Sequence, residues 1–198
     1  MKRGILFVMS GPSGTGKGTV CAELLKTEPI FLSVSATTRE KRKGETEGVT
    51  YNYLSEEEFK ALIETDEMLE YAQYSGNYYG TPKRNVEKML EAGINVLLEI
   101  EPQGALSVKR MIPEAVLIFI APPSMAELKN RLVGRGRETD EQIEQRMRAA
   151  EWELRQAPKY NYVVVNDNLH ECAEEISNIL KIKTKENTII ENLLNEKY

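Results

Sequence analysis

The stretch Gly11-Pro12-Ser13-Gly14-Thr15-Gly16-Lys17 decides the fold of this chain. It matches the pattern G-x-x-x-x-G-K of a phosphate-binding loop. It also stands between an apolar run at 5–9 and helical spacing of apolar residues over 16–25, which is the context that such a loop requires. Glycines let the backbone wrap around an anion, and the helix N-terminus adds partial positive charge. The alternative is an ordinary turn with a surface lysine, but the context favours a phosphate loop in which Lys17 reaches the outer phosphates of a nucleotide.

The position after Lys17 departs from the common form of this loop. Ser or Thr usually stands there and holds Mg²⁺ through its hydroxyl, whereas here Gly18 is followed by Thr19. We therefore expect any Mg²⁺ to be held by substrate phosphates and water, which is its usual preference. This departure disfavours GTPases and motor ATPases and favours a kinase that acts on a small molecule.

Further apolar runs extend the pattern along the chain. The runs at 5–9, 96–98, 116–120 and 162–165 are typical of strands buried on both faces of a parallel sheet. Amphipathic helices are predicted over 125–133 and 141–154, and residues 173–180 are predicted to begin a C-terminal one. Alternating strands and helices predict an α/β fold, a parallel sheet flanked by helices.

Two segments interrupt this alternation. Residues 35–79 contain a basic loop, strand-like pieces at 51–53 and 69–74, and a capping-box helix start at Ser55, and we predict that they form an inserted lobe. Residues 133–140, with Gly134-Arg135-Gly136-Arg137, are predicted to form a short mobile lid. The core of this single domain, 1–198, would then comprise 1–34, 80–132 and 141–198.

Composition limits the classes of protein that remain. A net charge of -5 argues against a general nucleic-acid binder. No apolar stretch approaches the ~18 residues of a membrane span, so we expect a cytoplasmic protein without a membrane partner. Cys21 and Cys172 have neither disulfide nor metal-ligand spacing and are predicted to be small buried residues. The sequence does not distinguish a monomer from a homo-oligomer.

Several segments, taken in order, resemble guanylate kinase. They are Ser10-Gly11-Pro12-Ser13-Gly14, Ser35-Ala36-Thr37-Thr38-Arg39, Gly76-Asn77-Tyr78-Tyr79-Gly80-Thr81, Ile120-Ala121-Pro122-Pro123-Ser124, Gly134-Arg135-Gly136 and Asn166-Asp167. The resemblance implies transfer of the γ-phosphoryl group of ATP to GMP, giving ADP and GDP with Mg²⁺, in purine metabolism and GMP recycling. It also implies a core, a GMP-binding lobe and a lid.

The resemblance assigns the ATP phosphates to Gly11, Pro12, Ser13, Gly14, Thr15, Gly16, Lys17, Gly18 and Thr19. Phosphoryl transfer depends on positioning and on cations that neutralise spreading charge. The resemblance implies that these cations are Lys17, Arg39, Arg135 and Arg146. Arg131, Arg137 and Arg148 are expected to be solvated or salt-bridged.

The acceptor site follows from the chemistry of GMP. Arg39 and Arg42 can bind its phosphate bidentately, and the resemblance adds Tyr51 and Tyr79; without it, the arginines could equally be solvated loop residues. A carboxylate can accept the N1–H and N2–H of guanine, and a hydroxyl can donate to O6. The resemblance assigns these tasks to Ser35, Glu70, Thr81 and Glu101, where Glu101 replaces the family's aspartate. Adenine lacks the N1–H donor, so such a site rejects AMP.

Glu99 and Glu101 follow an apolar strand at the edge where α/β ligands bind. Glu99 is a candidate to hold Mg²⁺ through water, and the alternative is that both carboxylates cap the helix from Gln103. His170 is expected at the surface, Trp152 and Met147 in the core, and Asn168 near the adenine.

Two other functions compete with a GMP kinase. One is a non-catalytic binding module of the same family, which the presence of Lys17, Arg135 and Arg146 disfavours. The other is a related kinase for a different acceptor, such as a sugar bisphosphate. It is disfavoured by the combined set for guanine and phosphate, namely Ser35, Glu70, Tyr51 and Tyr79.

Overall fold

The structure, a computed structural model, describes residues 3–74, 76–134 and 139–195. Its centre is a five-stranded sheet in the order β2-β7-β1-β8-β9, and every neighbouring pair is parallel. The strands are β1 (Leu6–Ser10), β2 (Ile30–Leu32), β7 (Asn95–Glu99), β8 (Val116–Ala121) and β9 (Tyr162–Val165). The predicted parallel α/β sheet is therefore confirmed.

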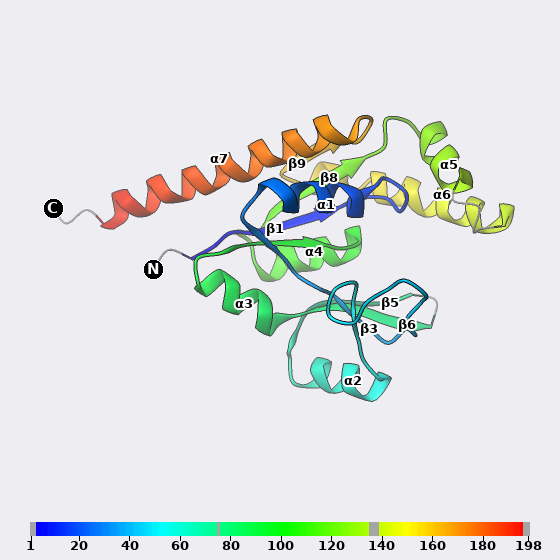
Figure 1. The fold of residues 1–198 in the computed structure, drawn as a ribbon, viewed down its shortest axis with the longest axis horizontal. Coiled ribbons are helices and arrows are strands. Elements are labelled where there is room, and N and C mark those ends of the chain that lie inside the picture. The colour runs from blue at the N-terminus through cyan, green and yellow to red at the C-terminus, as the bar shows by residue number, and fades with distance from the viewer. Residues whose placement is uncertain (1–2, 75, 135–138, 196–198) are drawn as a thin grey trace.

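Helices cover both faces of this sheet (Figure 1). Successive residues of a strand point to opposite faces, so Phe7 and Met9 of β1 pack with α1 (Lys17–Thr27) and α7 (Leu169–Asn195). Leu6 and Val8 pack on the other face with α3 (Lys83–Glu91) and α4 (Pro102–Met111). The phosphate loop, at the end of β1, is thus supported by the centre of the core.

A second sheet, with the order β4-β3-β6-β5, forms a lobe beside α3 and α4 (Figure 1). Its strands are β3 (Ala36–Thr37), β4 (Asn52–Tyr53), β5 (Met68–Tyr74) and β6 (Asn77–Pro82), and α2 (Glu56–Glu64) packs against it through the buried Phe59. The predicted capping box is present, since Ser55 Oγ accepts from Glu58 N and Glu58 Oε2 accepts from Ser55 N. The strand-like pieces at 51–53 and 69–74 are likewise observed as β4 and β5.

The remaining helices lie beyond β8. They are α5 (Met125–Gly134), α6 (Asp140–Leu154) and a short 3₁₀ helix, η1 (Ala157–Lys159). Of the predicted lid, Val133 and Gly134 end α5 and Thr139 caps α6, while residues 135–138 lie outside the described part. The C-terminal helix predicted to begin within 173–180 is observed as α7 (Leu169–Asn195).

Two expectations about burial are wrong. Val163 and Val165 of β9 are half exposed, because β9 is an edge strand and not one covered on both faces. Trp152 was expected in the core but is 50% exposed, whereas Met147 on the same helix packs against Leu128 and Leu132. Cys21 and Cys172 are buried free thiols, as predicted. None of the helices in the described ranges has the length and apolar character needed to cross a membrane.

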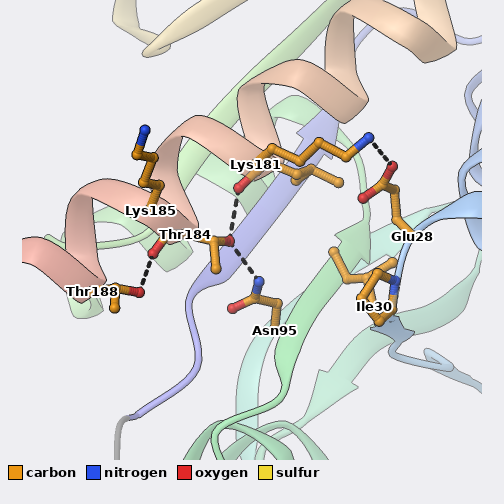
Figure 2. A pocket seen from close by; sticks show the side chains of 9 residues that line it. Glu28, Ile30, Asn95, Lys181, Thr184, Lys185 and Thr188 are labelled. Carbon is orange, nitrogen blue, oxygen red and sulfur yellow. Dashed lines mark hydrogen bonds and ion pairs between the residues drawn. The ribbon is translucent and has the colours of Figure 1, made fainter.

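The middle of α7 forms a hydrogen bond and an ion pair with residues near the amino ends of the strands (Figure 2). Asn95 Nδ2 donates to Thr184 Oγ1 at 2.9 Å, Asn95 Oδ1 accepts from Ile5 N, and Lys181 Nζ lies 2.9 Å from Glu28 Oε1. Asn95, Thr184, Lys181 and Glu28 are among the residues that line a cavity of about 290 Å³. It lies at the opposite end of the strands from the phosphate loop, whereas α/β sheets bind ligands at the carboxyl ends.

Candidate active site

The phosphate loop has the backbone that its glycines predict. Gly14 and Gly16 have φ values of 98° and 87°, in the left-handed region that side chains rarely adopt. Space excludes a side chain as well, since a Cβ on Gly11 would lie 2.2 Å from Ile120 O. Lys17 is buried and its Nζ donates to Gly11 O at 2.6 Å. The lysine therefore lies folded over the loop, with its charge at the place where phosphates would bind.

A side chain that follows the edge strand β9 supports this loop. Asn166, directly after β9, is buried and its Nδ2 donates to Thr15 O at 2.7 Å. The backbone carbonyl of Asn166 accepts from Arg131 Nη1 at 2.9 Å. Arg131 is also ion-paired with Glu127, so the expectation of a salt-bridged Arg131 is confirmed. In the sequence, Asn166 stands out only as part of a family motif. Its contact with the loop depends on the position of β9, which the sequence pattern does not give.

The end of β7 brings two carboxylates toward the loop. Both oxygens of Glu99 lie 3.6 Å from where a Cβ on Gly18 would be, so the missing side chain leaves room between the helix and the carboxylate. Burial raises the pKa of Glu99, and the charge of Lys17 opposes that shift. Glu101 is the N-cap residue of α4 but makes no side-chain capping bond. The alternative in which the Glu101 carboxylate caps the helix is therefore wrong.

A cavity of about 230 Å³ lies between the loop and the lobe. It is lined by five of the predicted site residues, namely Lys17, Ser35, Tyr51, Glu99 and Glu101. Residues from the phosphate loop, from β7 and from the lobe thus meet around one space. The cavity is large enough for part of a nucleotide.

The basic loop of the lobe is held by Glu45, a carboxylate that was not predicted as a site residue. Arg39 Nη2 lies 2.7 Å from Glu45 Oε1, and the other Glu45 oxygen accepts from Arg42 N and from the Tyr53 hydroxyl, each at 2.8 Å. The Arg39 pair, the Arg42 amide and the Tyr53 hydroxyl together lower the pKa of Glu45 to about 2. The only sequence signal for this role is an acidic residue within a basic loop.

Two predicted tyrosines extend this cluster. The Arg39 guanidinium lies 5.7 Å from the centroid of the Tyr51 ring, and the Tyr51 and Tyr79 rings meet edge to face at 6.0 Å. The Arg42 side chain is exposed. Three of the four groups expected to hold the phosphate of the acceptor are therefore in contact with one another.

Glu70 lies in β5, directly opposite Thr81 of β6, and both side chains are buried. Thr81 Oγ1 donates to Glu70 Oε1 at 2.7 Å. Burial raises the pKa of Glu70 to about 7, although bonds from Thr81 oppose the shift. A carboxylate so short of water gains most from a ligand that donates two hydrogen bonds to it.

The other predicted residues lie as follows. Arg146 of α6 reaches the phosphate loop, with Nη1 3.4 Å from Ser13 Oγ, whereas Arg135 lies outside the described residues. His170 is exposed, as expected, and Asn168 accepts from the backbone N–H groups of His170 and Glu171 at the start of α7.

Glu153 was not predicted as a site residue. Burial and the charge of Glu101 raise its pKa to about 7.

Comparisons with known proteins agree on one family. The family model described as guanylate kinase matches residues 3–183. The guanylate kinase of Clostridium perfringens SM101 is 53% identical over 197 residues, which are 98% of this chain and 91% of the relative. A guanylate kinase of Thermus thermophilus is 54% identical over 178 residues, which are 90% of this chain and 81% of the relative.

Solved structures give the same result. The crystal structure of guanylate kinase from Anaplasma phagocytophilum superposes with a TM-score of 0.77 at 38% identity, covering 92% of this chain and 87% of that one. A gluconokinase from Sinorhizobium meliloti, with a TM-score of 0.52 at 13% identity over 96% and 98% of the two chains, shares the fold alone. Because the family match spans 3–183 and relatives are more than half identical over most of their length, the chain belongs to the guanylate kinase family.

Proposed function

We propose that the chain is an ATP:GMP phosphotransferase, which transfers the γ-phosphoryl group of ATP to GMP and releases ADP and GDP. The observation that carries this proposal is the cavity between loop and lobe, which Lys17 lines together with Ser35 and Tyr51. A kinase must bring a triphosphate and an acceptor phosphate to one point, because catalysis of phosphoryl transfer consists largely of positioning and charge neutralisation. Family membership supports the same reaction.

The donor half of the site is the loop from Gly11 to Thr19. When ATP binds, Lys17 exchanges its bonds with the loop carbonyls for bonds with the outer phosphates. Arg146 lies beside Ser13 and can follow the transferred group, and Arg135 is proposed to join it from the lid. These cations, with Arg39 on the acceptor side, neutralise the charge that spreads over the phosphoryl oxygens.

The acceptor half lies in the lobe. We assign the GMP phosphate to Arg39, Arg42, Tyr51 and Tyr79, and guanine recognition to Ser35, Glu70, Thr81 and Glu101. Thr81 donates to one oxygen of Glu70, and the other oxygen has no side-chain donor among the described residues, which supports a role in accepting N1–H and N2–H of guanine. AMP would leave this buried carboxylate facing a lone pair, and that loss gives selectivity.

We propose Mg²⁺ as the cofactor, held mainly by the substrate phosphates and through water by Glu99. The Glu99 carboxylate lies close to Gly18, with both oxygens 3.6 Å from where a Cβ would be, and carboxylate oxygens are ligands that suit Mg²⁺ or its bound water. Within the described ranges there is no group of three His, Cys, Asp or Glu side chains placed to hold a metal ion. When bound, the ion would supply positive charge that neutralises the phosphate groups.

We propose that the lobe at 35–79 and the lid at 133–140 close over the core, exclude water and suppress hydrolysis of ATP. We further propose a cytoplasmic role in purine metabolism and GMP recycling, with ATP and GMP as the partners and with neither nucleic acid nor membrane.

One coupled assay of ADP release tests the proposal. With GMP we expect strong activity, with dGMP reduced activity, and with AMP, UMP and CMP little. Equal rates with AMP would contradict the assignment of Glu70. Binding of GMP without turnover would instead identify a non-catalytic module, and turnover of a sugar phosphate alone would identify a different kinase.

A further inference from the structure

Gly104 occupies a position where helix chemistry disfavours glycine. It lies in the first turn of α4 and is buried. Glycine within a helix costs about 0.5–1 kcal/mol relative to alanine. Its φ is not among the positive values, so its backbone conformation does not require glycine. The reason for glycine must therefore be space.

The space beside Gly104 is filled by the carboxylate of Glu70. A Cβ on Gly104 would lie 2.6 Å from Glu70 Oε2 and 3.1 Å from Glu70 Cδ, whereas the next neighbour, Ile100 Cδ1, is at an ordinary 3.4 Å. The clash concerns this carboxylate and no backbone atom. An added methyl group would thus be accommodated by moving one side chain.

That side chain has little freedom to move. Glu70 Oε1 is held by the Thr81 hydroxyl at 2.7 Å, and the neighbouring Leu69 packs into the core cluster that contains Ala105 and Val108 of α4. Glu70 is thereby enclosed between the lobe and a core helix. To reach an ordinary 3.4 Å contact, Oε2 would have to retreat by 0.8 Å, a large shift for a group that must accept two hydrogen bonds in a fixed plane.

We propose that Gly104 is a positioning residue for guanine specificity, since its missing side chain is the space in which Glu70 presents its carboxylate to the base. This rests on the proposed role of Glu70. The fold itself tolerates a methyl group there, but base recognition does not. Gly104 therefore acts on the acceptor nucleotide through Glu70 and has no direct contact with substrate.

The variant Gly104→Ala tests this. We expect GMP to bind roughly tenfold to hundredfold more weakly, the scale of one or two charge-assisted hydrogen bonds, with a lower ratio of GMP to AMP turnover. The KM for ATP should not change, because the clash is with the Glu70 carboxylate and not with the phosphate loop. Ser107→Ala, one turn further along α4, is the matched control, as its hydroxyl bonds with Gln103 O and Arg110 Nη2, and it should leave GMP binding unchanged.

A shorter acidic side chain at position 70 should relieve the clash with Ala at position 104. In the Gly104→Ala background, Glu70→Asp withdraws the oxygens by one methylene, and GMP selectivity should partly return. If Gly104→Ala does not fold, Glu70→Asp or Glu70→Ala should restore folding by removing the clash; no restoration would overturn the proposal. So would a Gly104→Ala protein that keeps both its GMP affinity and its GMP to AMP ratio.

Glu70→Ala separates this inference from the proposed function. If Glu70 does not bind guanine, Glu70→Ala alone leaves the ratio of GMP to AMP turnover unchanged. In that case the proposed role of Glu70 and that of Gly104 are both wrong. If Glu70→Ala lowers the ratio and Gly104→Ala does not, only the role of Gly104 is wrong. If the inference is right, Gly104→Ala has almost no further effect on GMP binding once Glu70 is alanine, which a double-mutant cycle measures directly.

Discussion

Glu70→Gln should make the protein more stable at alkaline pH and less selective. The pKa of Glu70 is raised from 4.5 to about 7 because burial disfavours its charged form. The folded state therefore binds more protons than the unfolded state between these values, and this carboxyl costs stability as pH rises through that window. The raised pKa therefore lowers the free energy of unfolding by about 3 kcal/mol at pH values above 7.

Glutamine keeps the shape of the side chain and still accepts from Thr81 but carries no charge. We expect the gain in unfolding free energy over the parent to be below about 1 kcal/mol at pH 5 and to approach about 3 kcal/mol at pH 8. Urea unfolding at both pH values, without nucleotide, measures it. An equal gain at the two pH values would refute the raised pKa as the cause.

The same variant should lose selectivity. An amide offers a single acceptor oxygen where the ionised carboxylate offers two, so GMP turnover falls relative to AMP turnover. An unchanged ratio of kcat/KM for GMP and AMP would refute the contact with guanine. Stability and selectivity should thus change in opposite directions at this one position.

Three other changes have defined outcomes. Lys17→Met should lower kcat about a hundredfold or more, with GMP binding by calorimetry little changed, because the lost charge acts on the transferred group. Glu45→Gln should raise the KM for GMP severalfold while sparing that for ATP, because it releases Arg39 from its 2.7 Å ion pair; equal effects on both would contradict this. Cys21 should resist a thiol reagent in the native protein and react in denaturant, because it is buried and burial raises its pKa.

The sequence predicted the elements that carry continuous apolar runs. Strands β1, β7 and β8 lie where expected, since central parallel strands are apolar on both faces. Strand β6 was missed because Gly80 and Pro82 interrupt it, and its pairing with β5 supplies the stability that local propensity lacks. Tertiary context also decided the exposure of Val163, which periodicity cannot predict.

Among the site residues too, local motifs could be recognised in the sequence and long-range contacts could not. Lys17 was predictable because its motif is local, whereas the resemblance was needed to single out Glu70. Glu45, Asn166 and Gly104 act through contacts with residues distant in sequence or through the space they leave. No spacing rule marks such roles, so sequence reasoning did not assign them.

The bond from Asn166 to Thr15 also bears on how this protein is made. It joins residues 151 positions apart, so during synthesis the phosphate loop lacks this support until β9, which follows it in the chain, has been made. The central strand β1 likewise waits for β7 and β8, since parallel neighbours cannot form a hairpin. A nascent chain that lacks β9 therefore contains the phosphate loop without this support, and a nucleotide can stabilise the complete site only after β9 has been synthesised.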